Sequence, residues 1–144
     1  MILLGDTKVE KNIKFGTGGF RGVIGDDFNK ENIQLVAQAL ANVILENNQE
    51  KQPIIIGFDN RFMSDYAARW FAEVLNGNGI RTLVYTHSVP TPTVMSTTRD
   101  MQNFYGVMMT ASHNPYYFNG IKVFTKEGYD ADVAFTSLDR KSVV

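Results

Sequence analysis

Two hydrophobic patterns alternate along this chain, one typical of helices and one typical of buried strands, and their alternation limits the folds that it can adopt. Between residues 33 and 44, apolar side chains recur every three or four residues, which is typical of a helix with one buried face: Ile33, Val36, Ala37, Leu40 and Ile44. Residues 54–58 instead form a short, uninterrupted apolar run after Pro53, as expected for a strand covered on both faces. The alternation predicts an α/β domain in which helices cover both faces of a sheet.

The remaining segments continue this alternation. Asn29, Ser64 and Thr91 are side chains of the kind that cap helix starts, so we expect a helix after each of them. Further extended segments are expected at residues 13–16, 20–24, 80–85, 104–109 and 120–124. The loop between the last two is too short to hold a crossover helix, so these two should be antiparallel. We therefore expect a three-layer α/β/α domain with a mixed, mostly parallel sheet of about four main strands.

Composition narrows the classes of function. The 144 residues fit one domain, and 44% hydrophobic with 20% charged residues is ordinary for a globular protein. A net charge of -1 gives no electrostatic reason to expect nucleic acid or an anionic membrane as partner. No cysteine is present, which excludes disulfides and thiolate metal sites. No apolar run approaches the roughly 18 residues of a membrane span. We therefore expect a soluble, cytoplasmic protein.

The segment at residues 105–124, YGVMMTASHNPYYFNGIKVF, carries most of the chemistry. A buried strand runs directly into Thr-Ala-Ser-His-Asn-Pro, and Pro115 stiffens this loop by restricting its own backbone and that of its neighbour. Asn119-Gly120 predicts a tight return, after which Lys122 can point back at the loop. The pattern predicts a nucleophile or phosphate carrier at Ser112, beside groups that balance charge and move protons.

Other interpretations of this loop remain open at this point. A plain polar turn after a strand explains residues 112–114 equally well, because loops are polar by default. A serine-hydrolase dyad is disfavoured, since Ser112 and His113 are adjacent and diverge in extended backbone. The sequence also has no G-x-S-x-G nucleophile elbow.

Three further segments are expected beside this loop, at the carboxyl ends of the strands: residues 15–22, 59–61 and 88–91. The first, FGTGGFRG, can bring backbone amides close to a phosphate, although a simple hairpin turn is the alternative. Arg21 within it either serves the site or pairs with a surface carboxylate. In the second, GFDNR, Asp59 and Arg61 predict an ion pair that braces the loop.

TASHNP followed by NGIK resembles the active-site serine motif of the α-D-phosphohexomutases, the phosphoglucomutase/phosphomannomutase family. FGTGGFRG is similar to the N-terminal glycine-rich signature of that family. The resemblance implies that Ser112 is phosphorylated in the active enzyme. It implies catalytic roles for Ser112, His113, Lys122 and Arg21, and it adds Thr17 to these four as a phosphate-binding residue.

The resemblance also implies the activity. Phosphate would move between O1 and O6 of a hexose phosphate, with a hexose 1,6-bisphosphate as intermediate and activator. Mg²⁺ would be bound through the phosphate of Ser112 and by aspartates of a second domain. The family's D-G-D-G-D-R metal motif does not occur in this sequence. Residues 1–144 are therefore expected to be domain I alone, without domains II–IV, and inactive by themselves.

The hexose phosphate and the remaining domains of the same polypeptide are thus the expected partners. Two alternatives come from the residues: a non-catalytic phosphate-binding α/β module, and an interaction domain derived from the family. The sequence has neither a Walker P-loop nor a dinucleotide fingerprint, which argues against the first alternative.

Overall fold

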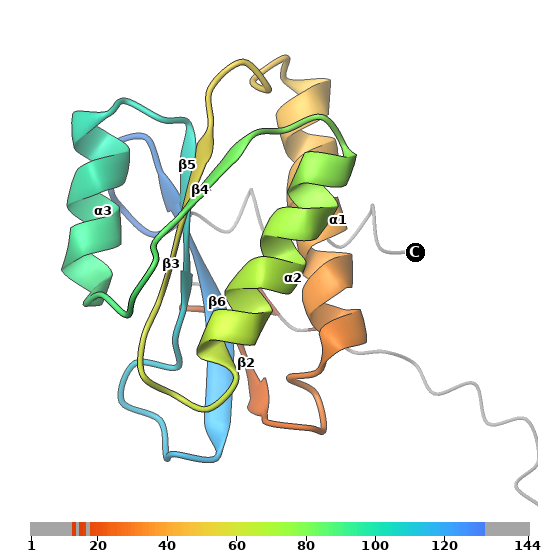
Figure 1. Cartoon of the computed structure of the whole chain (residues 1–144), viewed down its shortest axis with the longest axis vertical. Helices are drawn as coiled ribbons and strands as arrows, with labels where there is room; N and C mark the ends of the chain where they lie inside the picture. The colour runs from red at the N-terminus through yellow and green to blue at the C-terminus, as the bar shows by residue number, and fades with distance from the viewer. Residues whose placement is uncertain (1–12, 14, 17, 132–144) are drawn as a thin grey trace, which may run out of the picture.

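The computed structural model describes residues 13, 15, 16 and 18–131, and in this part of the chain a sheet lies between two layers of helices (Figure 1). The strands are β1 (Phe15–Gly16), β2 (Gly19–Val23), β3 (Ile54–Phe58), β4 (Thr82–Val84), β5 (Tyr105–Met109) and β6 (Phe118–Thr125). The helices are α1 (Lys30–Glu46), α2 (Ser64–Gly77) and α3 (Thr91–Asp100). None of these helices is both long and apolar enough to cross a bilayer.

The sheet has the order β1-β2-β6-β5-β3-β4. β3 pairs in parallel with β4 and β5, whereas β6 is antiparallel to β5 and β2, and β2 is antiparallel to β1. The α/β class and the mixed sheet are confirmed, as is the antiparallel return of the last strand. Four of the six strands, β2, β3, β5 and β6, have five residues or more, in agreement with the expectation of about four main strands. The described sheet is less parallel than expected, because its strands form two parallel and three antiparallel pairings. The glycine-rich segment causes the difference, because it forms a hairpin that extends the sheet beyond β6.

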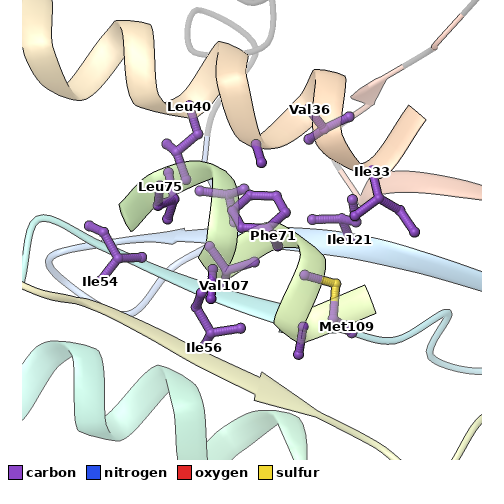
Figure 2. Packing of buried hydrophobic residues seen from close by; sticks show 14 of the residues in the cluster. Ile33, Val36, Leu40, Ile54, Ile56, Phe71, Leu75, Val107, Met109 and Ile121 are labelled. Atoms are coloured by element: carbon purple, nitrogen blue, oxygen red, sulfur yellow. The ribbon is translucent and has the colours of Figure 1, made fainter. Parts of the chain in front are cut away.

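The two faces of the sheet have separate cores. Helices α1 and α2 cover one face and α3 covers the other (Figure 1). Figure 2 shows the larger core, with Phe71 of α2 between side chains of α1 and side chains of the strands. Successive strand residues alternate between the faces, so Val107 and Met109 enter this core while Met108 enters the smaller core under α3. The three-layer arrangement is therefore confirmed.

Two of the expected helix caps can be judged from the backbone at the helix starts. Asn29 has an extended backbone, and its side chain accepts a hydrogen bond from the Asn32 N–H at 2.9 Å, which confirms it as the cap of α1. Thr91 is the first residue of α3, and Pro90 occupies the cap position before it. The expected cap at Thr91 is therefore wrong by one residue.

Helix α3 lies very close to β5 at Gly106. A β-carbon at Gly106 would collide with the side chain of Thr98. Thr98 is fully buried, and its hydroxyl donates to the Val94 carbonyl at 2.7 Å. Because this hydrogen bond fixes the Thr98 side chain, glycine is needed at position 106 for α3 to pack on the sheet.

We expect Gly106→Ala to lower the free energy of unfolding by about 1–3 kcal/mol, because the added methyl group overpacks the contact with α3. Gly77→Ala is the matched control, since nothing lies within 4 Å of the position that its β-carbon would take. The control should be neutral or slightly stabilising, because alanine is the better helix former. Urea unfolding measures both variants. Equal unfolding midpoints for the two would contradict the close approach.

Candidate active site

Two polar loops begin side by side at the carboxyl ends of two neighbouring strands. β3 and β5 are parallel neighbours whose last paired residues are Phe58 and Met109. One step further, the Asp59 N–H still donates to the Met109 carbonyl at 3.2 Å. The loops at residues 59–63 and 110–117 therefore leave the sheet together, at the lower end of these strands in Figure 1. In α/β sheets, functional groups gather at the carboxyl ends of the strands.

Ser112 is exposed and has a left-handed backbone, with φ of 54°. This conformation costs a residue other than glycine roughly 1–2 kcal/mol, so it persists only where the surroundings hold it. The Ser112 N–H donates to Thr110 Oγ1 at 3.0 Å, and the Ser112 carbonyl accepts from Arg61 Nη2 at 2.9 Å. Both backbone polar groups of Ser112 are therefore bound while the residue itself stays accessible.

The guanidinium of Arg61 gathers the carbonyl groups of this loop. Nη2 donates to the carbonyls of Ser112 and Asn114, the latter at 2.7 Å. Nη1 donates to the carbonyls of Pro115 at 2.8 Å and Phe118 at 3.0 Å. The sequence predicted an ion pair that braces the loop. The structure shows the brace, and its main partners are four backbone carbonyls.

The carboxylate of Asp59 connects both loops to the start of α2. Its Oδ1 accepts from the Arg61 N–H at 3.0 Å and from the Ser64 hydroxyl at 2.8 Å, and its Oδ2 accepts from the Thr110 hydroxyl at 2.6 Å. Arg61 Nε lies 3.7 Å from the same Oδ2. The expected helix cap at Ser64 is therefore wrong. Ser64 is the first residue of α2, after Met63 with φ of 66°, and its hydroxyl binds the carboxylate instead.

Asn119 is fully buried where β6 begins. Its Nδ2 donates to the Phe62 carbonyl at 3.0 Å and to Ser64 Oγ at 2.8 Å, and its Oδ1 accepts from the Gly120 N–H at 2.8 Å. The expected tight return at Asn119-Gly120 is wrong, because both residues belong to β6. The turn lies at residues 115–118, where the Phe118 N–H donates to the Pro115 carbonyl. Here the tertiary partners of the Asn119 amide override the turn preference of the Asn-Gly pair.

Arg21 reaches the serine loop from β2. Its Nη1 donates to Asn114 Oδ1 at 2.7 Å, so within the described residues its partner is a loop amide, whereas the alternative interpretation expected a surface carboxylate. Arg21 lies opposite Gly120 in the β2–β6 ladder. A β-carbon at Gly120 would lie 3.2 Å from Arg21 Cγ and would collide with the Phe20 carbonyl. Glycine at position 120 therefore leaves room for the arginine side chain.

Lys122 lies on the same side of the sheet as Arg21. It is two residues beyond Gly120 on β6, and residues two apart on a strand share a face. In the β5–β6 ladder it lies opposite Met108, before the serine loop begins. Its Nζ is 3.5 Å from Asp130 Oδ1, and its side chain is 15% exposed. The structure thus places Lys122 within β6, on the strand that returns from the loop, with an acidic residue as its partner.

The other residues expected at the site are placed as follows. His113 follows Ser112 in the loop and is exposed. Thr17 lies outside the described residues. The segment at residues 88–91 reaches the carboxyl end of β3, where the Val89 N–H donates to the Phe58 carbonyl at 2.9 Å. Geometry therefore places Ser112 and His113 in one exposed loop, which Arg21 contacts from β2 through Asn114.

An open hollow of about 570 Å³ lies between the two loops. Its lining consists of Asp59, Asn60, Arg61, Phe62, Asn114 and Tyr116. The aromatic side chains at its rim are strongly exposed, Phe62 to 73% and Tyr116 to 86%. Space for a small polar molecule is thus present next to the serine loop.

Sequence reasoning gave Thr110 no role of its own and expected only a turn at Asn119, although both are almost fully buried and hydrogen-bonded. A signal was available. Thr110 directly follows the apolar strand β5, and Asn119 directly precedes the apolar part of β6. Buried polar groups are tolerated only with partners. The identity of those partners depends on which loops meet in space.

The residues that the structure describes contain no cluster of three or more His, Cys, Asp or Glu side chains that could hold a metal ion. Mg²⁺ takes several oxygen ligands in near-octahedral geometry and usually keeps some of its waters.

Comparison with known proteins agrees with this architecture. The family model for phosphoglucomutase/phosphomannomutase, alpha/beta/alpha domain I, matches residues 12–138. A phosphoglucomutase from Staphylococcus saprophyticus is 35% identical over 119 residues, which are 81% of this chain and 21% of that protein. A phosphoglucosamine mutase from Chlamydia caviae is 37% identical over 124 residues, 85% of this chain and 27% of that protein.

A crystal structure of a candidate phosphomannomutase from Thermus thermophilus superimposes with a TM-score of 0.86 at 32% identity, covering 92% of this chain and 30% of that one. The α/β/α layers and the serine loop are thus those of a phosphosugar mutase domain. The chain belongs to the phosphoglucomutase/phosphomannomutase family, the α-D-phosphohexomutases, and matches its N-terminal domain. It spans between about a fifth and a third of the length of these relatives.

We expect Asn119→Ala to lower the free energy of unfolding by about 2–4 kcal/mol, because it leaves the buried Gly120 N–H and Phe62 carbonyl with fewer partners. Asn60→Ala is the control, since Asn60 is exposed in the neighbouring loop. Thermal and urea unfolding measure the difference. A loss below about 0.5 kcal/mol, the usual range of surface substitutions, would contradict a structural role for Asn119.

Proposed function

We propose that Ser112 carries a phosphoryl group and passes it to a hydroxyl of a hexose phosphate, so that the chain acts as the phosphoserine-bearing domain I of a phosphohexomutase. One observation carries the proposal: Ser112 of the TASHNP motif is exposed on a backbone that is bound at both its N–H and its carbonyl. A carrier must present its oxygen in line with the acceptor, and a fixed but accessible residue is suited to that task.

In the transfer, the bond between Ser112 Oγ and phosphorus breaks while a bond forms between phosphorus and the sugar hydroxyl oxygen. The proton of the sugar hydroxyl passes to a nearby base, and the departing Ser112 Oγ takes up a proton from a nearby acid to become a hydroxyl. The hexose bisphosphate then reorients and returns its other phosphate to Ser112, so that phosphate moves between O1 and O6. Positive groups stabilise the negative charge that spreads over the transferring oxygens.

The chain's own residues supply these groups in the proposal. Arg21 contacts the loop through Asn114 at 2.7 Å, and in the proposal it orients the phosphoryl group. Lys122 adds a second charge on the same side of the sheet and takes part in proton transfer. His113 positions the sugar hydroxyl or assists the proton. Thr17 contributes to phosphate binding.

In the proposal, the other metal ligands and the sugar-recognising groups belong to other domains of a longer polypeptide. Mg²⁺ would be held by a phosphoserine oxygen together with ligands from another domain, and it would neutralise charge on the phosphoryl group. The sugar-recognising domains would likewise come from the same polypeptide, which we propose to act in the cytoplasm. Relatives named for different sugars match this domain about equally well, so the choice of hexose is left open.

The carrier role predicts covalent phosphate on Ser112. The product of the complete open reading frame, treated with hexose 1,6-bisphosphate and Mg²⁺, should gain the mass of one phosphoryl group by intact-mass spectrometry. Ser112→Ala should gain none. Ser96→Ala, a control in α3 whose hydroxyl donates to the Thr93 carbonyl, should be modified like the wild type. Stoichiometric phosphate in Ser112→Ala would exclude Ser112 as carrier, and reversible phosphate binding without modification would favour a non-catalytic module.

A second prediction concerns residues 1–144 alone. This chain should convert no glucose 1-phosphate to glucose 6-phosphate in a coupled assay, because in the proposal the aspartate ligands of Mg²⁺ and the sugar-recognising groups belong to other domains of a longer polypeptide. Circular dichroism confirms that the sample is folded. Robust turnover by the folded chain would show that the described domain contains all the groups that the reaction needs.

A further inference from the structure

Both backbone groups of Ser112 are linked to the same carboxylate. The Ser112 N–H donates to Thr110 Oγ1, and the Thr110 hydroxyl donates to Asp59 Oδ2. The Ser112 carbonyl accepts from Arg61 Nη2, and the backbone N–H of Arg61 donates to Asp59 Oδ1. Asp59 therefore holds the two residues, Thr110 and Arg61, that bind the peptide units on either side of the serine. None of these hydrogen bonds joins Asp59 to the serine itself.

This arrangement matters because the backbone of Ser112 is strained. An L-residue with φ of 54° leaves the left-handed region unless something holds it there. Rotation of either flanking peptide would turn the bond from Cα to Cβ, and with it the direction of the hydroxyl. The apolar core does not prevent this, since Ser112, His113 and residues 115–117 are all exposed.

Arginine is suited to the carbonyl side of this clamp. Its planar guanidinium presents five N–H donors in a fixed fork, and here four hydrogen bonds go to carbonyls between residues 112 and 118. A lysine ammonium is a point charge with three donors and cannot match this geometry. The side chain of Arg61 is only 15% exposed, so water competes little for these bonds.

We propose that Asp59, acting through Arg61 and Thr110, is a positioning residue that sets the direction of the Ser112 hydroxyl and thereby the rate of phosphoryl transfer. The inference rests on the proposed function, because it assumes that Ser112 is the carrier. It assigns to Asp59, Arg61 and Thr110 a role in the orientation of the serine, without contact to the sugar or the transferring phosphate.

The test uses the product of the complete open reading frame. Arg61→Lys keeps the charge but loses the fork, and Thr110→Val keeps the shape but loses the hydroxyl. Both should lower kcat by about 10- to 100-fold, the scale expected when a reacting group is displaced by about 1 Å. KM should stay within about threefold of the wild type, because the interaction acts on the transfer step rather than on sugar binding.

Two further variants separate positioning from general stability. Thr110→Ser restores the hydroxyl and should recover most of the rate lost in Thr110→Val. Arg69→Lys is a matched control, since Arg69 is exposed on α2 and lies over the Tyr66 ring, and it should transfer phosphate at the wild-type rate. All rates are measured well below the unfolding temperature of each variant.

A structural readout tests the clamp independently of activity. Hydrogen exchange at the Ser112 amide, resolved by mass spectrometry or NMR, should be at least about tenfold faster in Thr110→Val than in Thr110→Ser, because the acceptor Thr110 Oγ1 is lost. Unchanged exchange would overturn the inference whatever the activity.

The outcomes distinguish this inference from the proposed function. If wild-type protein never acquires phosphate on Ser112, the proposed function fails. If it does, but folded Arg61→Lys and Thr110→Val transfer phosphate at the wild-type rate, only the positioning role is overturned. If Arg61→Lys does not fold, the comparison of Thr110→Val with Thr110→Ser decides, since equal rates for these two would overturn it.

Discussion

The carboxylate of Asp59 joins the end of β3 to the start of α2 and to a loop that is 51 residues away in sequence. It lies one residue beyond β3, and it binds the start of α2 through Ser64 and the loop after β5 through Thr110. Arg61, two residues away, adds three carbonyls of the same loop and the carbonyl of Phe118 at the start of β6. Because β3 and β5 are parallel neighbours that end together, one acidic side chain can reach all of these groups.

This polar network adjoins the apolar core of the domain, and the two have different physical roles. Below it, Val107 and Met109 are fully buried, and burial of such side chains holds the strands and helices together without specifying direction. Above it, much of the loop is exposed and gains little from burial. Hydrogen bonds are directional, so they can fix the carbonyls and the serine backbone in one arrangement. The core thus fixes where the loop leaves the sheet, and the network fixes its shape.

Membership of the phosphoglucomutase/phosphomannomutase family fits this division of roles. Relatives whose names carry glucose and glucosamine resemble the chain to a similar degree, at 35% and 37% identity. What the domain contributes in our proposal is the carrier and its orientation, which every such transfer needs whatever the sugar.

Sequence alone was sufficient for the α/β class, for the helix cap at Asn29 and for the antiparallel return after β5, because periodicity, caps and loop length are local properties. It also placed a brace at Asp59 and Arg61. It failed where a polar side chain found a tertiary partner: Ser64 binds Asp59 instead of capping α2, and the buried Asn119 belongs to β6 instead of a turn. Local propensity cannot register a partner such as that of Asn119, which is more than 50 residues away in sequence.

The sequence by itself therefore determined which segments are strands and helices, and that a serine follows a buried strand in a short, stiff loop. Only the tertiary structure decided that this serine has a left-handed backbone, that Arg21 reaches its loop from a hairpin added beyond β6, and that Lys122 pairs with Asp130. The physical reason is that apolar patterning requires only burial, whereas the direction of a polar side chain depends on which donors and acceptors the completed sheet brings within about 3 Å of it.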